Sequence, residues 1–362
     1  MRLGVEAALV DGALLPGDVE ILDGRVAAVG LAGLGLGIAV PGFVDLQVNG
    51  FGGVDFAAAD AAGYRAAGAA MLETGVTAFQ PTFITAGEAE LAASLAEVPD
   101  EPIGPRLLGV HLEGPFLSPE HPGVHPVEYL RAPDLALAER LLAGGGVRYV
   151  TLAPELPGAL ELIDALHARG IVVSLGHSGA TAAEADRAFD RGVGTVTHLF
   201  NAMRGFHHRE PGIAGAALAR DDIVVQAIID GHHLARDAEL LVWRAAAGRL
   251  ALVTDAIAAA GVGDGEYRLA GVAVDVRDGV ARGPVGELAG SVLTMLQAVR
   301  NLHALGASLP DAIGAATAVP ARAGRLPGVG VLTEGGPADV VVLDDRLEIR
   351  TVIVAGEVPA AV

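Results

Sequence analysis

Short apolar runs alternate with alanine-rich stretches of helical spacing through the middle of this chain. Many residues in the runs are β-branched, and the spacing predicts eight buried strands separated by helices. The predicted strands are Val44–Gln47, Val76–Gln80, Leu107–Val110, Val147–Leu152, Ile171–Leu175, Gly194–Val196, Ile223–Ile229 and Leu250–Val253. The predicted helices include Ala57–Thr74, Ala86–Leu95, Glu155–Ala168 and Ala180–Arg191. This alternation predicts an α/β protein with a (β/α)8 TIM-like barrel.

The two ends of the chain have a different pattern, with short strands and turns in place of helices. Asp23-Gly24 separates two apolar runs in the manner of a tight hairpin, and the tail repeats this style. We therefore expect both termini to form one small β-sandwich domain from residues 1–43 and 336–362. The catalytic barrel would then occupy residues 44–335, with Tyr267–Ala281 as an inserted hairpin.

The amino-acid composition excludes several kinds of catalytic and metal-binding site. The chain has 362 residues, no cysteine, and only arginine among its 24 basic residues. Disulfides, thiolate metal sites and cysteine nucleophiles are therefore excluded. The absence of lysine also excludes a Schiff base and a carbamylated-lysine metal bridge.

Charge and hydropathy restrict the partners and the location. A net charge of −20 argues against nucleic acid, because a phosphate backbone requires a basic footprint. The run 26–44 carries no charge, but its glycines and Pro41 predict strand, turn and strand and not a membrane helix. No signal peptide is evident, so we expect a cytoplasmic protein without a membrane contact.

Four predicted strands are each followed by a histidine or an acid. Glu113, His177 and His198 make a set of two histidines and one carboxylate, which can hold a catalytic zinc and leave a position open for water. Asp255 follows the last strand as a free acid. Since residues after parallel strands meet at one rim of a barrel, the pattern predicts metal-assisted hydrolysis.

Each histidine alone has a more ordinary interpretation, because a buried histidine is most often a structural hydrogen-bonding group. The argument for a site therefore depends on the set. We expect His111 to support the site or the fold and not to bind the metal. The pair His207 and His208 lies in a loop for which solvation and an anion contact both remain open.

Several longer segments resemble the N-acetylglucosamine-6-phosphate deacetylases of the amidohydrolase superfamily, over nearly the whole chain. The matching segments are Pro41–Asp45, His111–Phe116, Gly176–Ser178, Thr197–Met203, Arg209–Gly212, Asp230–His233, Val253–Ala256 and Gly290-Ser291.

The resemblance implies a role for each matching position. Glu113, His177 and His198 would bind the divalent metal, and Asp255 would be the general base and acid. His125 would help to polarise the acetamide carbonyl, and His233 would contact the sugar. The phosphate receptors would be Asn201 and the backbone of Ala202, with Arg209 reaching the phosphate from the other subunit of a homodimer.

One position departs from the wider superfamily. Many relatives have His-x-His after the first barrel strand to hold a second metal, and this chain has Gln47-Val48-Asn49. Amides are weak ligands for zinc-like ions. We therefore expect one divalent ion per chain, with zinc as the first expectation and iron, cobalt or manganese as alternatives. Gln47 could hydrogen-bond a metal-bound water.

The resemblance implies hydrolysis of N-acetyl-D-glucosamine 6-phosphate, a phosphorylated amino sugar, to D-glucosamine 6-phosphate and acetate. Two alternatives remain at this stage. One is another metal-dependent amidohydrolase, such as a deaminase or an N-acyl hydrolase. The other is a non-catalytic sugar-phosphate sensor, although a sensor has no need of a free acid such as Asp255 beside a metal.

Overall fold

The computed structural model describes residues 1–33 and 35–359 of the chain. Residue 34, within the apolar run 26–44, and residues 360–362, at the end of the predicted small domain, lie outside the described residues. On either side of residue 34 the chain forms strands β4 (Arg25–Leu31) and β5 (Ile38–Pro41). No helix among the described residues is long and apolar enough to cross a membrane.

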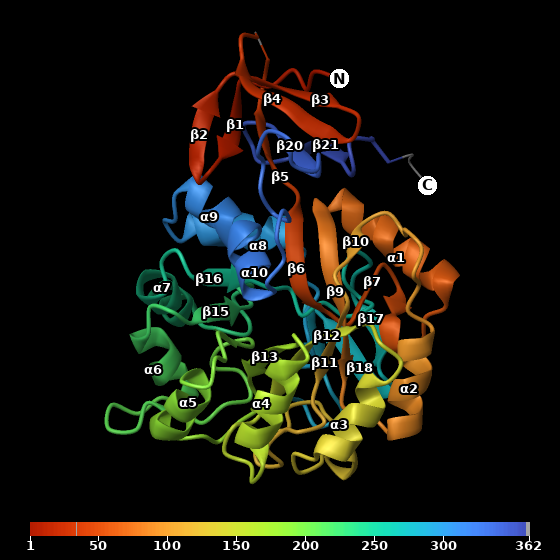
Figure 1. Ribbon diagram of the computed structural model, residues 1–362, viewed down its shortest axis with the longest axis vertical. Coiled ribbons are helices and arrows are strands. Elements are labelled where there is room, and N and C mark those ends of the chain that lie inside the picture. Colours follow the sequence, from red (N-terminus) through yellow and green to blue (C-terminus); the bar gives the residue numbers. More distant parts are fainter. Residues whose placement is uncertain (34, 360–362) are drawn as a thin grey trace.

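Within the described part of the chain, eight parallel strands form the predicted barrel, and helices surround it (Figure 1). The strands are β6 (Phe43–Val48), β9 (Val76–Ile84), β11 (Val110–Glu113), β12 (Val147–Leu152), β13 (Val172–Leu175), β14 (Thr195–Val196), β15 (Val224–Ala227) and β16 (Leu250–Leu252). The barrel closes beyond the end of β16, where the Asp255 N–H donates to the Gln47 carbonyl at 2.9 Å. Its apolar core combines aliphatic side chains with several phenylalanines. The barrel strands also bury polar side chains such as Thr151, Thr195 and Gln226.

The helices follow the strands in chain order. They are α1 (Ala61–Glu73), α2 (Glu88–Ala96), α3 (Leu135–Leu142), α4 (Ala159–Ala168), α5 (Ala182–Phe189), α6 (Gly212–Ala219), α7 (Arg236–Ala245), α8 (Met295–Ala304), α9 (Leu309–Ala315) and α10 (Ala318–Ala323). All four helices with predicted bounds begin later than the sequence pattern predicts, and the shift is largest, four residues, for α1 and α4. Asp60 caps α1 by accepting from the Gly63 N–H at 2.8 Å, and Gly158 precedes α4 with a φ of +86°. Caps and glycine turns set these boundaries, whereas apolar spacing does not show them.

The third barrel strand differs from its prediction in a way that matters for the site. We predicted a strand over Leu107–Val110 with Glu113 in the turn beyond it. Instead, the short β10 (Arg106–Leu107) ends before Gly109, whose φ of +85° interrupts the strand. β11 then begins at Val110 and includes Glu113 as its last residue. Glu113 is therefore fixed by ladder pairing to both neighbouring strands.

The two chain ends build a separate pair of sheets above the barrel (Figure 1). β20 (Val340–Leu343) from the tail pairs antiparallel with β5, in the strand order β2-β1-β5-β20-β21. The outer strands of this sheet are β1 (Ala7–Val10), β2 (Ala13–Pro16) and β21 (Ile349–Ile353). The hairpin of β3 (Asp18–Leu22) and β4 shares one apolar core with it. The domain division at residues 43 and 336 stays a prediction.

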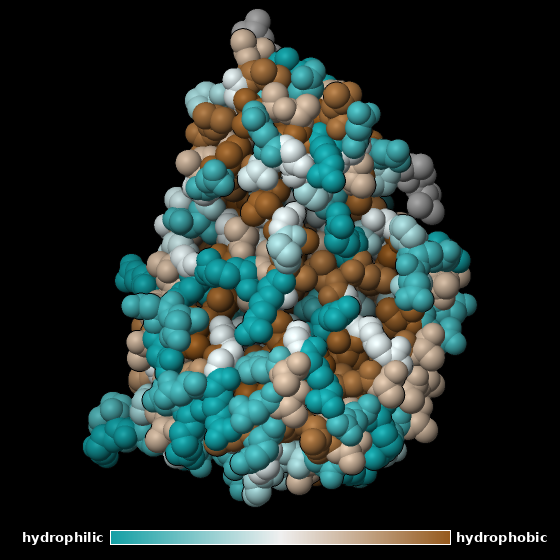
Figure 2. All heavy atoms as spheres, viewed as in Figure 1, coloured by the Kyte–Doolittle hydropathy of each residue, from teal (hydrophilic) through white to brown (hydrophobic). Residues whose placement is uncertain are grey.

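The predicted inserted hairpin has a third strand. β17 (Gly265–Leu269), β18 (Val272–Arg277) and β19 (Val280–Arg282) form a small antiparallel sheet. Its apolar face packs against Ile84, the last residue of β9, and Ile257, which lies beyond β16. Figure 2 shows polar side chains spread over the barrel part of the visible face, with apolar patches between them.

Candidate active site

The three predicted metal ligands and the predicted acid–base residue lie together where the barrel strands end. Glu113, His177, His198 and Asp255 all line one cavity of about 260 Å³. His177, His198 and Asp255 have φ values of +48°, +27° and +50°, a region that L-residues rarely adopt. Such strain is found mainly at functional sites, where the surrounding structure enforces it. Here the positive φ occurs just beyond each strand, at the residue whose side chain lines the cavity.

Three atoms in this cavity lie in mutual contact. Glu113 Oε1 is 3.1 Å from His177 Nε2 and 2.8 Å from His198 Nε2. The two Nε2 atoms are themselves 3.1 Å apart. This arrangement brings a carboxylate oxygen and two imidazole nitrogens to one point.

The protonation of His177 makes this point suitable for a cation. His177 Nδ1 lies 3.1 Å from the carbonyl oxygen of His121, which can only accept a hydrogen bond. Nδ1 therefore carries the proton, and in the neutral ring Nε2 presents a lone pair to the Glu113 carboxylate. The His177 lone pair and the Glu113 carboxylate oxygen therefore face each other without a hydrogen between them, and a divalent metal would supply the positive charge that this pair requires.

A fourth side chain also reaches Glu113. His125 Nε2 is 3.7 Å from Glu113 Oε2, and its ring packs on His177 with centroids 4.4 Å apart. The candidate ligand atoms of Glu113, His125 and His177 all lie within 4.8 Å of one another. Two ligand sets are therefore geometrically available, one completed by His198 and the other by His125.

Electrostatics keep Glu113 ionised. Burial alone would raise its pKa, but the imidazoles of His125, His177 and His198 around the carboxylate hold the pKa well below its usual range. Burial would lower the pKa of His198, and the hydrogen bond to Glu113 outweighs this and raises it. For His177 burial dominates and lowers the pKa to about 4, which favours the neutral ring that a metal needs.

Asp255 is held by a partner that we did not expect. Asn49 Nδ2 donates to Asp255 Oδ1 at 2.7 Å, which leaves Oδ2 as the oxygen available for proton transfer. Burial, followed by the negative charge of Glu113, raises the pKa of Asp255 to about 6. From the sequence we considered Asn49 only as a poor metal ligand, because its donor role depends on barrel closure.

The predicted substrate-binding residues line the same cavity, with one exception. Asn201, Ala202, His125 and His233 all contribute to its wall. His233 Nδ1 lies 2.8 Å from Asp230 Oδ2, so its other nitrogen is free to meet a ligand. The exception is Arg209, which lies in an exposed loop with its guanidinium 2.9 Å from His208 Nε2.

Two further predicted residues lie behind the cavity. Gln47 is fully buried and donates from Nε2 to Glu113 Oε1 at 3.2 Å. His111, as expected, points away from the candidate ligands and contacts Thr151 Oγ1 at 2.7 Å. Both residues stabilise the strand ends that carry the site.

The inserted sheet supplies residues that sequence reasoning missed. Leu269 from β17, together with Glu287 and Leu288 beyond β19, lines the cavity. Nothing in their local pattern indicates a site, because their position depends on how the inserted sheet packs on the barrel.

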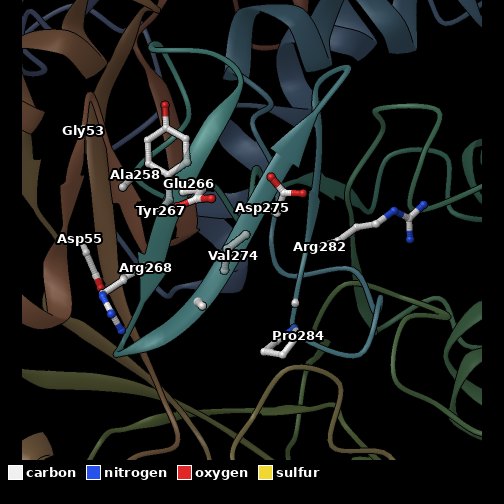
Figure 3. A pocket seen from close by; sticks show the side chains of 12 residues that line it. Gly53, Asp55, Ala258, Glu266, Tyr267, Arg268, Val274, Asp275, Arg282 and Pro284 are labelled. Carbon is white, nitrogen blue, oxygen red and sulfur yellow. The ribbon is translucent and has the colours of Figure 1, made fainter.

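A larger hollow exists on the inserted sheet, but it lacks the chemistry of the barrel site. Its volume is about 790 Å³, and Figure 3 shows Glu266, Asp275 and Arg282 among its labelled side chains. The described residues that line it include no histidine, and its charged side chains, three acidic and two arginine, lie on an open surface. We therefore assign the chemical site to the smaller cavity at the barrel rim.

Comparison with known proteins gives a consistent result. Residues 38–358 match the model of the amidohydrolase family. An N-acetylglucosamine-6-phosphate deacetylase of Bos taurus is 42% identical over 339 residues, which cover 88% of this chain and 83% of that protein. An N-acetylgalactosamine-6-phosphate deacetylase of Escherichia coli O157:H7 is 37% identical over 354 residues, which cover 94% and 93%.

A solved structure is also similar over almost its full length. It is a mutant N-acetyl-D-glucosamine-6-phosphate deacetylase of Mycobacterium smegmatis in complex with N-acetyl-D-glucosamine-6-phosphate. The TM-score is 0.94 at 38% identity, and the match covers 99% of this chain and 98% of that one.

Proposed function

Because the chain belongs to the amidohydrolase family, among its N-acetylglucosamine-6-phosphate deacetylases, we propose that it hydrolyses N-acetyl-D-glucosamine 6-phosphate. The products are D-glucosamine 6-phosphate and acetate. The observation that carries the proposal is the convergence of Glu113, His177 and His198 beside the free acid Asp255. Release of acetate from the purified protein supplied with this substrate is the direct test.

Glu113, His177 and His198 are the proposed ligands of one divalent ion, with zinc as the first candidate and iron, cobalt or manganese as alternatives. When bound, the ion lowers the pKa of a water and polarises the carbonyl. The single-ion proposal is supported by Gln47 and Asn49, whose amides already donate to Glu113 and Asp255. Glu113→Gln should lose the ion, which metal analysis measures directly.

Asp255 is the proposed acid–base group. Its free oxygen takes a proton as water attacks the acetamide carbon, and returns it to the sugar nitrogen as the C–N bond breaks. A pKa of about 6 suits both steps. The carboxylate is mostly ionised near neutral pH and can accept the proton, and its conjugate acid can return the proton to the nitrogen. His125 would donate to the carbonyl oxygen, and His233 would contact the sugar.

The phosphate would lie at Asn201 and the backbone of Ala202. The Ala202 N–H donates no hydrogen bond within residues 1–33 and 35–359, so it is free to meet an anion. The charged side chains that line the cavity include Glu113, Asp255 and Glu287 but no arginine among the described residues. A phosphate dianion therefore needs a cation from elsewhere. We propose Arg209 of a second copy in a homodimer, because the arginine lies in an exposed loop.

A second substrate is N-acetyl-D-galactosamine 6-phosphate, favoured by the similarity to the Escherichia coli relative. The two sugars differ only in the orientation of one ring hydroxyl. Comparison of kcat/KM for the two compounds separates the alternatives. A deaminase activity would release ammonia and no acetate, and a silent sensor would release neither product. A cytoplasmic location follows from the proposal, because a charged sugar phosphate does not cross a bilayer unaided.

A further inference from the structure

His125 is fixed by contacts on the side of its ring that faces away from the cavity. The backbone N–H of Thr85 donates to His125 Nδ1 at 3.2 Å, and Thr85 Oγ1 lies 3.0 Å from the same nitrogen. Thr85 is 1% exposed and directly follows strand β9, so this backbone cannot turn away. A backbone N–H is always a donor, and Nδ1 must therefore be the acceptor.

The opposite nitrogen then carries the proton. In the neutral ring an unprotonated Nδ1 leaves the hydrogen on Nε2, which faces Glu113 and the cavity. The hydroxyl of Thr85 lies 3.0 Å from Nδ1 and 3.3 Å from the Glu113 carbonyl oxygen, so its single hydrogen is shared between two acceptors. His177 has the reverse arrangement, because its Nδ1 donates to the His121 carbonyl. Two packed imidazoles therefore have opposite tautomers set by their partners.

We infer that Thr85 is a positioning residue that holds His125 as the Nε2–H tautomer, a neutral donor aimed into the site. The inference rests on the proposed deacetylase function for its consequence in catalysis. A nitrogen that carries hydrogen cannot bind a metal, so the ligand set is completed by His198 and not by His125. The Nε2–H instead meets the acetamide oxygen and stabilises the negative charge that develops there.

The tautomer itself is the first test. Zinc-loaded protein labelled with ¹⁵N-histidine is observed by two-bond ¹H–¹⁵N correlation, with His125 assigned by its loss in His125→Gln. We expect a protonated Nε2 and an unprotonated Nδ1 at neutral pH. A proton on Nδ1, or on both nitrogens, would overturn the inference, whether or not the protein releases acetate.

Substitution of Thr85 is the second test. Thr85→Val removes the hydroxyl, with its contacts to Nδ1 and to the Glu113 carbonyl oxygen, but keeps the backbone N–H that donates to Nδ1. We expect kcat to fall on the order of 10-fold with KM little changed, less than the roughly 10²–10³-fold loss expected when an oxyanion donor is removed. Thr85→Ser should restore most of the rate. Thr77→Val is the matched control, since Thr77 is equally buried at the other end of β9 and lies outside the cavity lining.

The substrate distinguishes positioning from a general loss of structure. An N-trifluoroacetyl analogue has a more electrophilic carbonyl and depends less on a donor at its oxygen. Thr85→Val should therefore lose less rate with this analogue than with the N-acetyl sugar. An equal loss with both, or a rate equal to that of Thr77→Val, would overturn the role of Thr85. A wild-type protein that releases no acetate would instead refute the proposed function and leave the tautomer measurement standing.

Discussion

At the scale of single residues, the site depends on side chains that turn inward directly after their strands. Asp255 does so with a φ of +50°, and its orientation is fixed by the donor Asn49. Asp255→Asn keeps nearly the same shape but cannot take a proton. We expect kcat to fall by roughly 10²–10⁴-fold while the metal content stays unchanged. A variant that keeps more than about a tenth of the wild-type kcat would show that another group moves the proton.

Asn49 should control the pH at which Asp255 works. Asp255 must be ionised to act as a base, so activity falls as the pH drops through its pKa, which is about 6 without a metal and lower beside a bound cation. The hydrogen bond from Asn49 favours the ionised form. Asn49→Ala should therefore move the acidic limb of the kcat/KM profile to higher pH. An unchanged limb would mean that Asp255 does not set this limb or that Asn49 does not tune it.

The choice between His125 and His198 as the third metal ligand can be measured directly. The two histidines are similarly buried, and both contact Glu113. Because Nε2 of His125 carries hydrogen, His125→Gln should keep about one ion per chain with a loss of kcat. His198→Gln should lose the ion itself. Metal analysis after dialysis compares the two variants, and the reverse result would assign the ligand role to His125.

At the scale of elements, apolar periodicity predicted the barrel strands but not all of their boundaries. Val147–Leu152 was predicted with both ends correct, since no glycine or proline interrupts it. The prediction was wrong around Gly109, because a positive φ is set by close backbone packing that an apolar pattern does not encode. The candidate ligands could be found because each lies within three residues of the end of an apolar run. Asn49, Thr85 and Glu287 could not, because their roles depend on contacts between elements distant in the sequence.

The inserted sheet is tied to the barrel by a buried acid. Asp55 Oδ2 accepts from the Ala270 N–H at 2.9 Å, at the turn between β17 and β18. Burial raises the pKa of Asp55 to about 6, although the two backbone donors oppose this. The folded state therefore binds this proton more tightly than the unfolded state, whose pKa is near 3.9. The contribution of Asp55 to the free energy of unfolding is therefore largest below about pH 4 and is lost as the pH rises through 6.

Asp55→Asn should remove this pH dependence. The wild-type free energy of unfolding should lose about 3 kcal/mol from this group between pH 4 and 7. At pH 4 the variant should have a lower free energy of unfolding than the wild type, because an amide cannot accept from both backbone donors. Its free energy of unfolding should, however, depend less on pH. Urea unfolding of both proteins across this range measures the difference. Parallel curves would show that Asp55 does not titrate in this window.

At the scale of the whole molecule, a single chain offers no permanently positive side chain in its cavity lining, among the described residues, to attract an anionic substrate. The chain has a net charge of −20, and the cavity is lined by three carboxylates and no arginine among the described residues. An anionic substrate would be repelled unless a cation lay near its phosphate. Arg209 is exposed in a loop next to Phe206, an aromatic residue that is 56% exposed. A surface of this kind fits an interface through which two copies exchange arginines.

Exchange of Arg209 can be tested by mixing two inactive chains. Arg209→Ala should raise KM strongly, because it removes a charge-assisted phosphate contact. When this variant is refolded with an equal amount of Asp255→Asn, random pairing in a two-fold dimer makes half of the dimers mixed. One site in each mixed dimer then holds Asp255 and borrows Arg209 from its partner, so about a quarter of the wild-type sites should reappear. If Arg209 acts within its own chain, no complete site can form. The mixture would then show only the average activity of the two parents.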